Sequence, residues 1–266
     1  MPNYICPLCQ LPLRTIQRQF SCDNNHSFDI AKENYVNLLP VQFKHSKNPG
    51  DSKAMVNARR SFLEQGFYQP LVNKLKELML QHMPDGNVLD AGCGEGFYTH
   101  QHKFDHNSVY GVDIAKEAIK KAAKKYQSCH FSVATLSQLP FNDEYFDWVY
   151  SVYAPILEQE FTRIMAPQGF LLTVTPGSKH LIELKEKIYQ EAQFHDDEKT
   201  PVKALSLVGE FQLNYQMKFT RGVDVLNLLS MTPFAFKASE KVKEILAQTN
   251  DFTCTADFKI RLFQKT

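Results

Sequence analysis

Hydrophobic runs alternate with amphipathic stretches over the central part of the chain. Short apolar segments bounded by turn residues predict buried strands, and apolar residues at helical spacing predict helices between them. The first predicted strand ends near Leu89, and the next four span 109–114, 130–134, 147–153 and 170–174. The predicted helices span 97–103, 115–126 and 156–165. This alternation is typical of a doubly wound α/β fold.

The same patterns continue on both sides of this central part. Upstream, helical spacing predicts one helix from Lys53 that ends at Gly66 and another from Tyr68 to about His82. Downstream, alternating residues predict two more strands, at 211–219 and 253–263. Helical spacing recurs at 179–192, 221–229 and 239–249.

The segment 87–96, NVLDAGCGEG, joins the first predicted strand to the first helix. It reads D-x-G-x-G-x-G, with Asp90 followed by Gly92, Gly94 and Gly96. Glycine permits positive φ and lets a ligand approach the main chain closely, so the pattern indicates a nucleotide-binding turn. The spacing differs from the G-x-G-x-x-G of dinucleotide-binding proteins. The alternative is a tight strand-to-helix turn without a ligand.

Asp113 ends the second strand, 23 residues after Asp90. A carboxylate at this place accepts hydrogen bonds from ribose hydroxyls. This feature is shared by NAD-binding proteins, so it does not distinguish between nucleotide cofactors. The alternative role for Asp113 is to cap the helix predicted at 115–126.

Cysteine spacing near the N-terminus predicts a metal site. Cys6, Cys9, Cys22 and His26 form the pattern C-x2-C-x12-C-x3-H. Two such pairs complete a tetrahedron around zinc, and the metal stabilises a module too small for its own core. The alternative, a redox CxxC, requires a thioredoxin-like βαβ context that the sequence lacks.

Composition indicates where the protein is located but does not identify a binding partner. The 266 residues carry a net charge of +1, so any basic surface must be local. No apolar run is long enough to span a membrane and no signal peptide is evident, so we expect a cytoplasmic protein. The remaining cysteines are then expected to be reduced, buried thiols: Cys93, Cys129 and Cys254.

The segment 14–60 is the most basic part of the chain. Its eight basic residues face four acidic ones and are Arg14, Arg18, Lys32, Lys44, Lys47, Lys53, Arg59 and Arg60. Interleaved aromatic residues could stack on unpaired bases, and these are Phe20, Phe28, Tyr35 and Phe43. The alternative is a solvated face with the aromatic residues in a small core.

The glycine pattern resembles the first motif of class I S-adenosyl-L-methionine (SAM)-dependent methyltransferases. That resemblance implies that the glycine loop lies beside the methionine part of SAM, with Asp90 near its amino end. It also implies the Rossmann-like, seven-stranded sheet of that class. Residues just after the third strand would flank the adenine, and the loop after the fourth strand would face the acceptor substrate.

The motifs together are similar to those of the RlmA-type 23S rRNA (guanine-N1)-methyltransferases. Besides the zinc pattern, the shared motifs are YVNLLP, NPGDS, ARRSFL, GFYQPL, DAGCGEGFYTH, YAP, PGSKHL and MTPF. The resemblance implies that the zinc-binding module at 1–40 helps to recognise a 23S rRNA hairpin. A linker with helices at 41–85 would lead into a methyltransferase domain at 86–266. One departure, Pro167-Gln168-Gly169 in place of PGG, affects only a turn.

The same resemblance implies the site residues. It implies that the four ligands named above bind zinc. It also implies that the glycine loop with Phe97, Tyr68 and His180 contact the cofactor. A surface position at a helix start is the alternative for His180. Guanine N1 is blocked in a paired stem, so the target base must be unpaired or flipped. Tyr153, after the fourth strand, is a candidate to stack on it; its alternative is a packed strand-end aromatic.

Two other functions remain open at this point. The same fold methylates small molecules in other families, because function depends on the site rather than the fold. A zinc-dependent RNA-binding protein without catalysis is the second alternative. The sequence does not identify a general base, and a homodimer whose two subunits form a hairpin-binding cleft is a further possibility.

Overall fold

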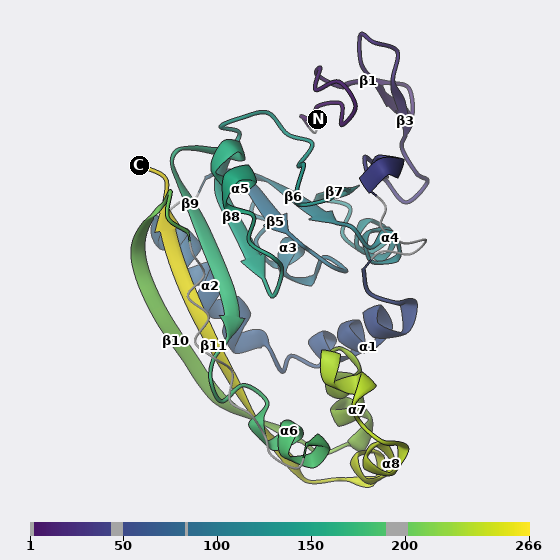
Figure 1. The fold of residues 1–266 in the computed structure, drawn as a ribbon, viewed down its shortest axis with the longest axis vertical. Helices are drawn as coiled ribbons and strands as arrows, with labels where there is room; N and C mark the ends of the chain where they lie inside the picture. The colour runs from purple at the N-terminus through teal and green to yellow at the C-terminus, as the bar shows by residue number, and fades with distance from the viewer. Residues whose placement is uncertain (1–2, 44–49, 83–84, 190–201) are drawn as a thin grey trace.

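A twisted sheet of eight strands forms the centre of the structure (Figure 1). The computed structural model describes residues 3–43, 50–82, 85–189 and 202–266. The sheet order is β10-β11-β9-β8-β5-β6-β7-β4. Its strands are β4 (Tyr35–Asn37), β5 (Gly86–Ala91), β6 (Asn107–Asp113), β7 (His130–Val133), β8 (Phe146–Val152), β9 (Met165–Pro176), β10 (Ser206–Phe219) and β11 (Phe252–Gln264).

Seven of these strands match the predicted methyltransferase sheet. Strands β7, β6, β5, β8 and β9 are parallel. Strand β11 pairs antiparallel to β9, and β10 pairs antiparallel to β11, so β10 again runs in the direction of the five parallel strands. The order reverses between β5 and β8, which places the carboxyl ends of these strands beside the crevice where ligands bind in such folds. The predicted α/β class and seven-stranded arrangement are therefore confirmed.

An eighth strand, which the sequence did not predict, adds to the seven at one edge of the sheet. Strand β4 comes from the N-terminal segment and pairs parallel to β7. The backbone N–H of Leu38 extends the pairing by donating to the carbonyl of Val133 at 2.8 Å. Tyr35 and Val36 are buried there, so the strand covers an edge that would otherwise be open. Three residues are too few to show a strand period in the sequence.

The N-terminal segment also forms a separate three-stranded sheet of β1 (Arg14–Ile16), β2 (Gln19–Ser21) and β3 (Ser27–Asp29). Its aromatic residues pack onto the large sheet. The Tyr4 ring lies 5.4 Å from Phe20 and 5.3 Å from Phe141 between ring centroids. Phe20 is buried in these contacts, so the small-core interpretation holds for it. Tyr35 is buried instead on strand β4, in the core of the large sheet. The side chain of Phe43 lies outside the described residues, as do Lys44 and Lys47.

The helices lie where their patterns predicted, with shorter ends. They are α1 (Lys53–Glu64), α2 (Gln69–His82), α3 (Phe97–Gln101), α4 (Lys116–Lys125), α5 (Glu158–Ile164), α6 (Ile182–Ile188), α7 (Gly222–Ser230) and α8 (Glu240–Gln248), with 3-10 turns at Val41–Phe43 and Pro233–Phe236. The end predicted for the helix at 179–192 lies outside the described residues. Helices α6, α7 and α8 gather at the end of the molecule opposite the zinc-binding segment (Figure 1). None of the helices in the described part of the chain has the length and apolar character to cross a bilayer.

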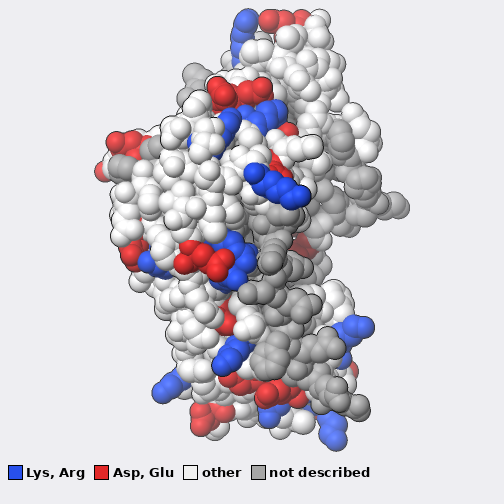
Figure 2. All heavy atoms as spheres, turned by 60° about the vertical axis from the view of Figure 1, so that its left-hand side comes forward, with Lys and Arg blue, Asp and Glu red and all other residues white. Residues whose placement is uncertain are grey.

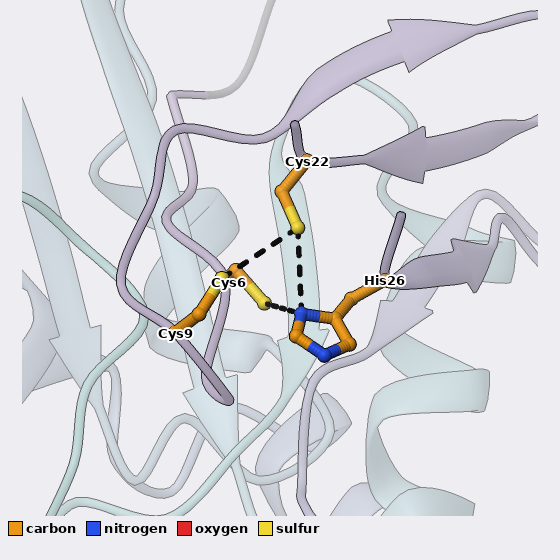
Figure 3. A group of neighbouring side chains, drawn as sticks. All are labelled: Cys6, Cys9, Cys22 and His26. Carbon is orange, nitrogen blue, oxygen red and sulfur yellow. Dashed lines mark hydrogen bonds between the residues drawn. The ribbon is translucent and has the colours of Figure 1, made fainter. Parts of the chain in front are cut away.

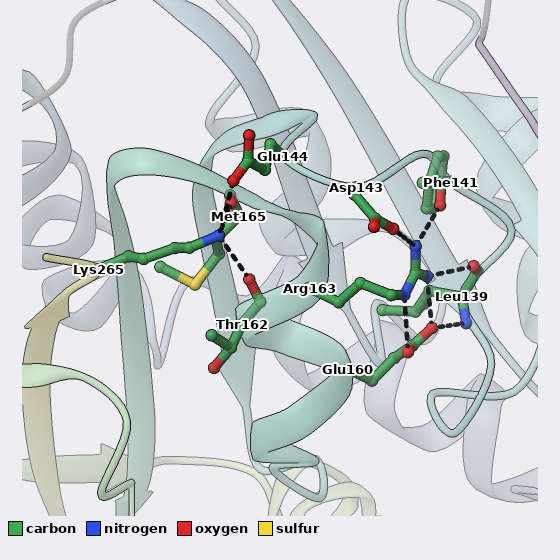
Figure 4. Close-up of polar contacts among 9 residues, drawn as sticks. All are labelled: Leu139, Phe141, Asp143, Glu144, Glu160, Thr162, Arg163, Met165 and Lys265. Atoms are coloured by element: carbon green, nitrogen blue, oxygen red, sulfur yellow. Dashed lines mark hydrogen bonds and ion pairs between the residues drawn. The ribbon is translucent and has the colours of Figure 1, made fainter.

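Two basic side chains fix the loop after β7 and the end of α5 (Figure 4). Arg163 donates to the carbonyls of Leu139 and Phe141 and pairs with Glu160 and Asp143. Lys265 donates to the carbonyls of Thr162 in the last turn of α5 and of Met165, the residue that follows the helix. Cations near a helix C-terminus satisfy carbonyls that lack partners within the helix. This network fixes residues 139–143, which directly follow the segment 135–138 that leads from the cavity described below.

Candidate functional site

The four predicted metal ligands meet at one point (Figure 3). The ligand atoms of Cys6, Cys9, Cys22 and His26 all lie within 4.8 Å of one another. His26 Nδ1 is 3.5 Å from the sulfur atoms of Cys6 and Cys22, and the sulfur atoms of Cys9 and Cys22 are 3.6 Å apart. Bonds of about 2.3 Å to sulfur and 2.0–2.1 Å to nitrogen predict edges of this size in a zinc tetrahedron.

Backbone turns present these ligands in pairs. The N–H of Gln10 donates to the Cys6 carbonyl at 2.8 Å, and Gln10 has φ of 61°. In the second turn the N–H of Asn25 donates to the Cys22 carbonyl at 2.9 Å, with φ of 59° at Asn25. The donor set of three thiolates and one imidazole is closed and is typical of structural zinc. The residues present fit Zn2+.

A cavity of about 680 Å³ lies at the carboxyl ends of β5, β6 and β8. Most of the predicted cofactor and substrate residues line it, and these are Tyr68, Gly92, Gly94, Phe97, Asp113, Tyr153 and His180. Helix α1 supplies Arg59 and Leu63, and the turn after α7 supplies 231–234. The structure therefore brings together residues from the linker, the glycine loop and the C-terminal part of the chain.

The three glycines have different reasons to be glycine. Gly92 has φ of +83°, and a Cβ there would lie 2.3 Å from Ala154 Cβ in the loop after β8. Gly94 has φ of +55° and faces open space, with Arg59 Nη1 3.7 Å from the Cβ position. Gly96, at φ of +80°, precedes α3 and packs against Ala122 and Phe131 rather than lining the cavity. Gly96 thus serves helix packing, while Gly92 and Gly94 open the main chain to a ligand.

Asp90 lies behind the glycine loop. It is 1% exposed, and its Oδ2 accepts a hydrogen bond of 2.6 Å from the Thr99 hydroxyl on α3. Burial raises the pKa of Asp90 to about 7. Asp90 is not among the described residues that line the cavity, so the geometry supports a positioning role through Thr99 rather than direct contact with a ligand.

Asp113 lines the cavity and holds two backbone groups. Its Oδ2 accepts from the N–H of Gly94 at 2.8 Å, and its Oδ1 accepts from the N–H of Ala115 at 2.7 Å. The capping role predicted as the alternative is thus partly present, at the turn before α4. An ionised carboxylate has about four acceptor sites, so Asp113 keeps capacity for hydroxyl donors in the cavity.

Tyr68, Tyr153 and His180 form one cluster at the cavity wall. His180 Nε2 is 3.1 Å from Tyr153 Oη and 3.5 Å from Tyr68 Oη. His180 is 5% exposed, so the surface alternative for this residue is wrong. Tyr153 is 44% exposed at the mouth of the cavity and contacts the His180 and Phe258 rings, with centroids 5.6 and 6.2 Å away.

Comparison with known proteins finds a matching family model for the N-terminal segment and another for the central domain. Residues 4–47 match the family model of the RlmA N-terminal zinc ribbon, and residues 88–169 match that of a methyltransferase domain. A 23S rRNA (guanine(748)-N(1))-methyltransferase of Streptomyces fradiae is 34% identical over 189 residues, covering 69% of this chain and 66% of its own. YxjB of Bacillus subtilis (strain 168) is 29% identical over 98% of this chain and 96% of its own. Its provisional name is that of a 23S rRNA (guanine-N(1)-)-methyltransferase.

The chain belongs to the RlmA-type methyltransferase family. Its fold is also that of a solved chain from the complex between the Haloferax volcanii Trm112 methyltransferase activator and its methyltransferase. That chain is 14% identical, with a TM-score of 0.52 and coverage of 81% of this chain and 99% of its own. The zinc ribbon and the SAM-type cavity are thus features of one family rather than an accidental combination.

Two residues in the cavity of this RlmA-type chain were missed in the sequence. Neither carboxylate oxygen of Glu95 has a hydrogen-bond partner among the described residues, although the side chain is buried. Burial raises the pKa of Glu95 to about 7. Arg59 of α1 forms an ion pair with Asp51 beside the glycine loop. The position of Glu95 between two glycines was a signal for it. Arg59 was noted in the sequence only as one of the basic residues and as part of the ARRSFL motif, which did not indicate a place in the cavity.

The basic surplus of the N-terminal segment is partly neutralised. Arg14 pairs with Asp23 at 3.4 Å, and Arg18 donates to the carbonyl of Ala31. On the face shown in Figure 2, basic and acidic side chains are interspersed rather than gathered into one large patch. A polyanion that approached this face would therefore meet individual basic side chains rather than an extended basic field.

Proposed function

We propose that this chain transfers the methyl group of SAM to N1 of a guanine in a 23S rRNA hairpin. The observation that carries the proposal is the cavity itself, because it joins the D-x-G-x-G-x-G loop to the exposed Tyr153 at the end of β8. The relatives whose names state this reaction support the choice of acceptor. The same chain carries the RlmA zinc ribbon.

SAM would occupy the part of the cavity between the glycine loop and Asp113. The main chain at Gly92 and Gly94 lies against this space, and the Asp113 carboxylate has acceptor sites for ribose hydroxyls. Phe97, Tyr68 and His180 complete the contacts that we assign to the cofactor. When bound, SAM supplies a methyl group already activated by the sulfonium charge.

The chain's own contribution to the reaction is alignment. Holding the acceptor nitrogen in line with the methyl group supplies roughly 7–11 kcal/mol in well-oriented reactions. N1 lies on the pairing edge of guanine, so the base must leave its stem or be unpaired to reach the cavity. The exposed ring of Tyr153 at the cavity mouth is the group that would receive it.

The zinc-binding module would help to select the RNA. We assign this role to the segment 1–40, with 41–85 as the linker and 86–266 as the methyltransferase domain. Arg14, whose side chain is 72% exposed on the module, could contact phosphate. A cytoplasmic location and a homodimer that encloses the hairpin stay predictions.

The test is transfer of labelled methyl groups from SAM to unmodified 23S rRNA, followed by mapping of reverse-transcriptase arrest. N1-methylguanine blocks base pairing, so arrest at one guanine establishes both the reaction and its site. Labelling without arrest would place the methyl group on another atom. Absence of labelling, with SAM binding still detected by a rise in melting temperature, would favour methylation of a small molecule. Absence of SAM binding would favour a non-catalytic RNA-binding protein.

A further inference from the structure

We propose that the Tyr153 hydroxyl donates a hydrogen bond to O6 of the target guanine and that His180 positions it for this purpose. The inference rests on the proposed function and adds to it a group that stabilises the reacting base. It differs from the stacking role suggested by the sequence, because it assigns the chemistry to the hydroxyl rather than to the ring. Tyr153 becomes a catalytic residue and His180 a positioning residue.

The hydrogen bonds of His180 determine which of its ring nitrogens carries the proton. The backbone N–H of Asp257 points at His180 Nδ1 over 3.2 Å. A backbone N–H can only donate, so Nδ1 must accept, and the proton of the neutral imidazole is then on Nε2. The hydrogen-bond pattern thus fixes which ring nitrogen is a donor.

The direction of the next hydrogen bond follows from this tautomer. His180 Nε2 is 3.1 Å from Tyr153 Oη, the shorter of its two tyrosine contacts. Because Nε2–H donates, Tyr153 Oη accepts, and the hydroxyl hydrogen of Tyr153 must point to another acceptor. Desolvation of the ring raises the pKa of Tyr153 well above the usual tyrosine value of about 10, so the hydroxyl carries its proton at neutral pH and can donate it.

The loop that carries His180 is held firmly by β11. The N–H of Lys179 donates to Asp257 Oδ2 at 3.0 Å, and the N–H of Gly177 donates to the Asp257 carbonyl at 2.8 Å. A Cβ at Gly177 would lie 2.4 Å from the Asp257 carboxyl carbon, so only glycine allows this approach. One β11 residue therefore fixes both the loop and the imidazole.

Tyr153 is held at an unusual backbone angle beside the glycine loop. Its φ is 58°, in the left-handed region that an aromatic residue seldom adopts. Its N–H donates to the carbonyl of Val174 at 3.1 Å, which fixes the turn after β8. Strained residues of this kind gather at functional sites. Tyr68, the other hydroxyl near His180, is only 3% exposed, so Tyr153 is the one that reaches an acceptor substrate.

The Tyr153 hydroxyl can stabilise the negative charge that forms on the target guanine. N1 of guanine must lose its proton to water before it attacks, and the negative charge that results is shared between N1 and O6. A donor placed at O6 stabilises that anion, as donors do for developing charge in other active sites. The N1–CH3 bond then forms as the S–CH3 bond breaks, leaving neutral methylguanine and neutral S-adenosylhomocysteine. His180 cannot take the N1 proton, because Nδ1 is engaged by Asp257 and Nε2 carries a proton.

The test compares Tyr153→Phe with the wild type over a range of pH. The variant keeps the ring and loses the hydroxyl, so single-turnover methylation of 23S rRNA should fall about 10- to 100-fold at neutral pH. The rise of rate with pH should move about one to two pH units to the alkaline side, because the bound base loses its proton less readily. SAM binding measured by calorimetry should be unchanged.

Tyr68→Phe is the matched control, since it removes a hydroxyl from the same histidine on the cofactor side. It should alter SAM affinity and leave the pH midpoint in place. His180→Gln, which keeps an amide donor, should be milder than His180→Phe. At saturating SAM, where the cofactor contact of His180 does not limit the rate, either change should add less than about threefold in the Tyr153→Phe background.

The outcomes separate the two proposals. Wild-type activity with arrest at a guanine, together with an unshifted pH profile in Tyr153→Phe, would overturn the role of the hydroxyl and leave the proposed function standing. A full loss in Tyr153→Ala with no change in Tyr153→Phe would return the residue to stacking alone. No arrest with the wild type would overturn both proposals.

Discussion

The zinc site and the cofactor cavity are built in opposite ways. The metal ligands come from one stretch of 21 residues, from Cys6 to His26, and two short turns bring them together. The cavity is lined by residues from Gly50 to Phe234, supplied by most of the molecule. A site formed by neighbours in sequence depends on spacing, whereas a site formed by distant elements depends on how the whole sheet packs.

The two regions nevertheless share a core. Tyr4 reaches from the zinc-binding segment to Phe141, and strand β4 completes the edge of the large sheet at β7. The backbone N–H of Ile5 also donates to the carbonyl of Pro140 at 3.0 Å. We therefore expect a substitution that disrupts the zinc site to destabilise the methyltransferase sheet as well. The following experiments measure the extent of this coupling.

The largest effect is expected from loss of the metal. Structural zinc contributes roughly 10–16 kcal/mol to the folding of isolated zinc-binding peptides. Cys22→Ser should abolish stoichiometric zinc by elemental analysis and increase hydrogen exchange at 4–40 and at β7. Cys254→Ser, which changes a buried cysteine outside the site, is the control and should keep its zinc. Unchanged exchange at β7 would mean that the two regions fold independently.

A smaller effect is expected from the contact between the two regions. Tyr4→Ala removes a buried ring between Phe20 and Phe141 and should cost about 3–5 kcal/mol of unfolding free energy in denaturant titration. Zinc should remain bound, because the ligands do not depend on this ring. A single transition that shifts as a whole would show one cooperative unit; two transitions would show that the module can separate.

The unfolding free energy should depend on pH mainly through Asp90, the buried carboxyl group behind the glycine loop of the cavity. Burial raises the pKa of Asp90 from 3.8 to about 7, so the folded state holds its proton more tightly than the unfolded state. This contribution is complete below the unfolded pKa and is lost as pH rises through about 7, by up to about 4 kcal/mol. Thermal melts of Asp90→Asn without SAM should show a weaker decline over that range. An equally steep decline would point instead to Glu95, and Glu95→Gln would test it.

Gly92→Ala should affect binding more than folding. The new methyl group would meet Ala154 at a φ of +83°, whereas the Gly94 position is open. We expect about 100-fold weaker SAM binding by calorimetry for Gly92→Ala and a clearly smaller loss for Gly94→Ala. Equal losses at the two positions would show that φ alone, rather than the approach of the β8 loop, sets the requirement for glycine.

The smallest effect on stability is expected at the surface of the zinc-binding segment. The Arg14–Asp23 pair is exposed, so Arg14→Ala should change the unfolding free energy by less than about 0.5 kcal/mol. Affinity for the rRNA hairpin should nevertheless fall, and the slope of its salt dependence should decrease by about one. Lys241→Ala on α8, at the opposite end of the molecule, is the control (Figure 1). An equal change in both variants would argue against RNA contact at Arg14.

Much of this molecule was predictable because its signals are local. The C-x2-C-x12-C-x3-H spacing predicted the metal ligands, and alternating apolar runs predicted seven strands of the sheet in order. The glycine pattern marked the turn between β5 and α3. Each of these features depends on residues that are near one another in the chain, so the sequence alone carries the information.

Other features were decided by contacts between distant segments. Strand β4 exists because the edge of β7 offers it a partner, and three residues cannot signal that in advance. Asp90 and Gly96 belong to the glycine motif, yet packing turns both away from the cavity. The tautomer of His180 depends on one backbone N–H from β11, 77 residues away. Spacing therefore determined the metal site and the sheet, while tertiary packing, which alone sets the environment of each polar atom, decided which side chains face the ligand.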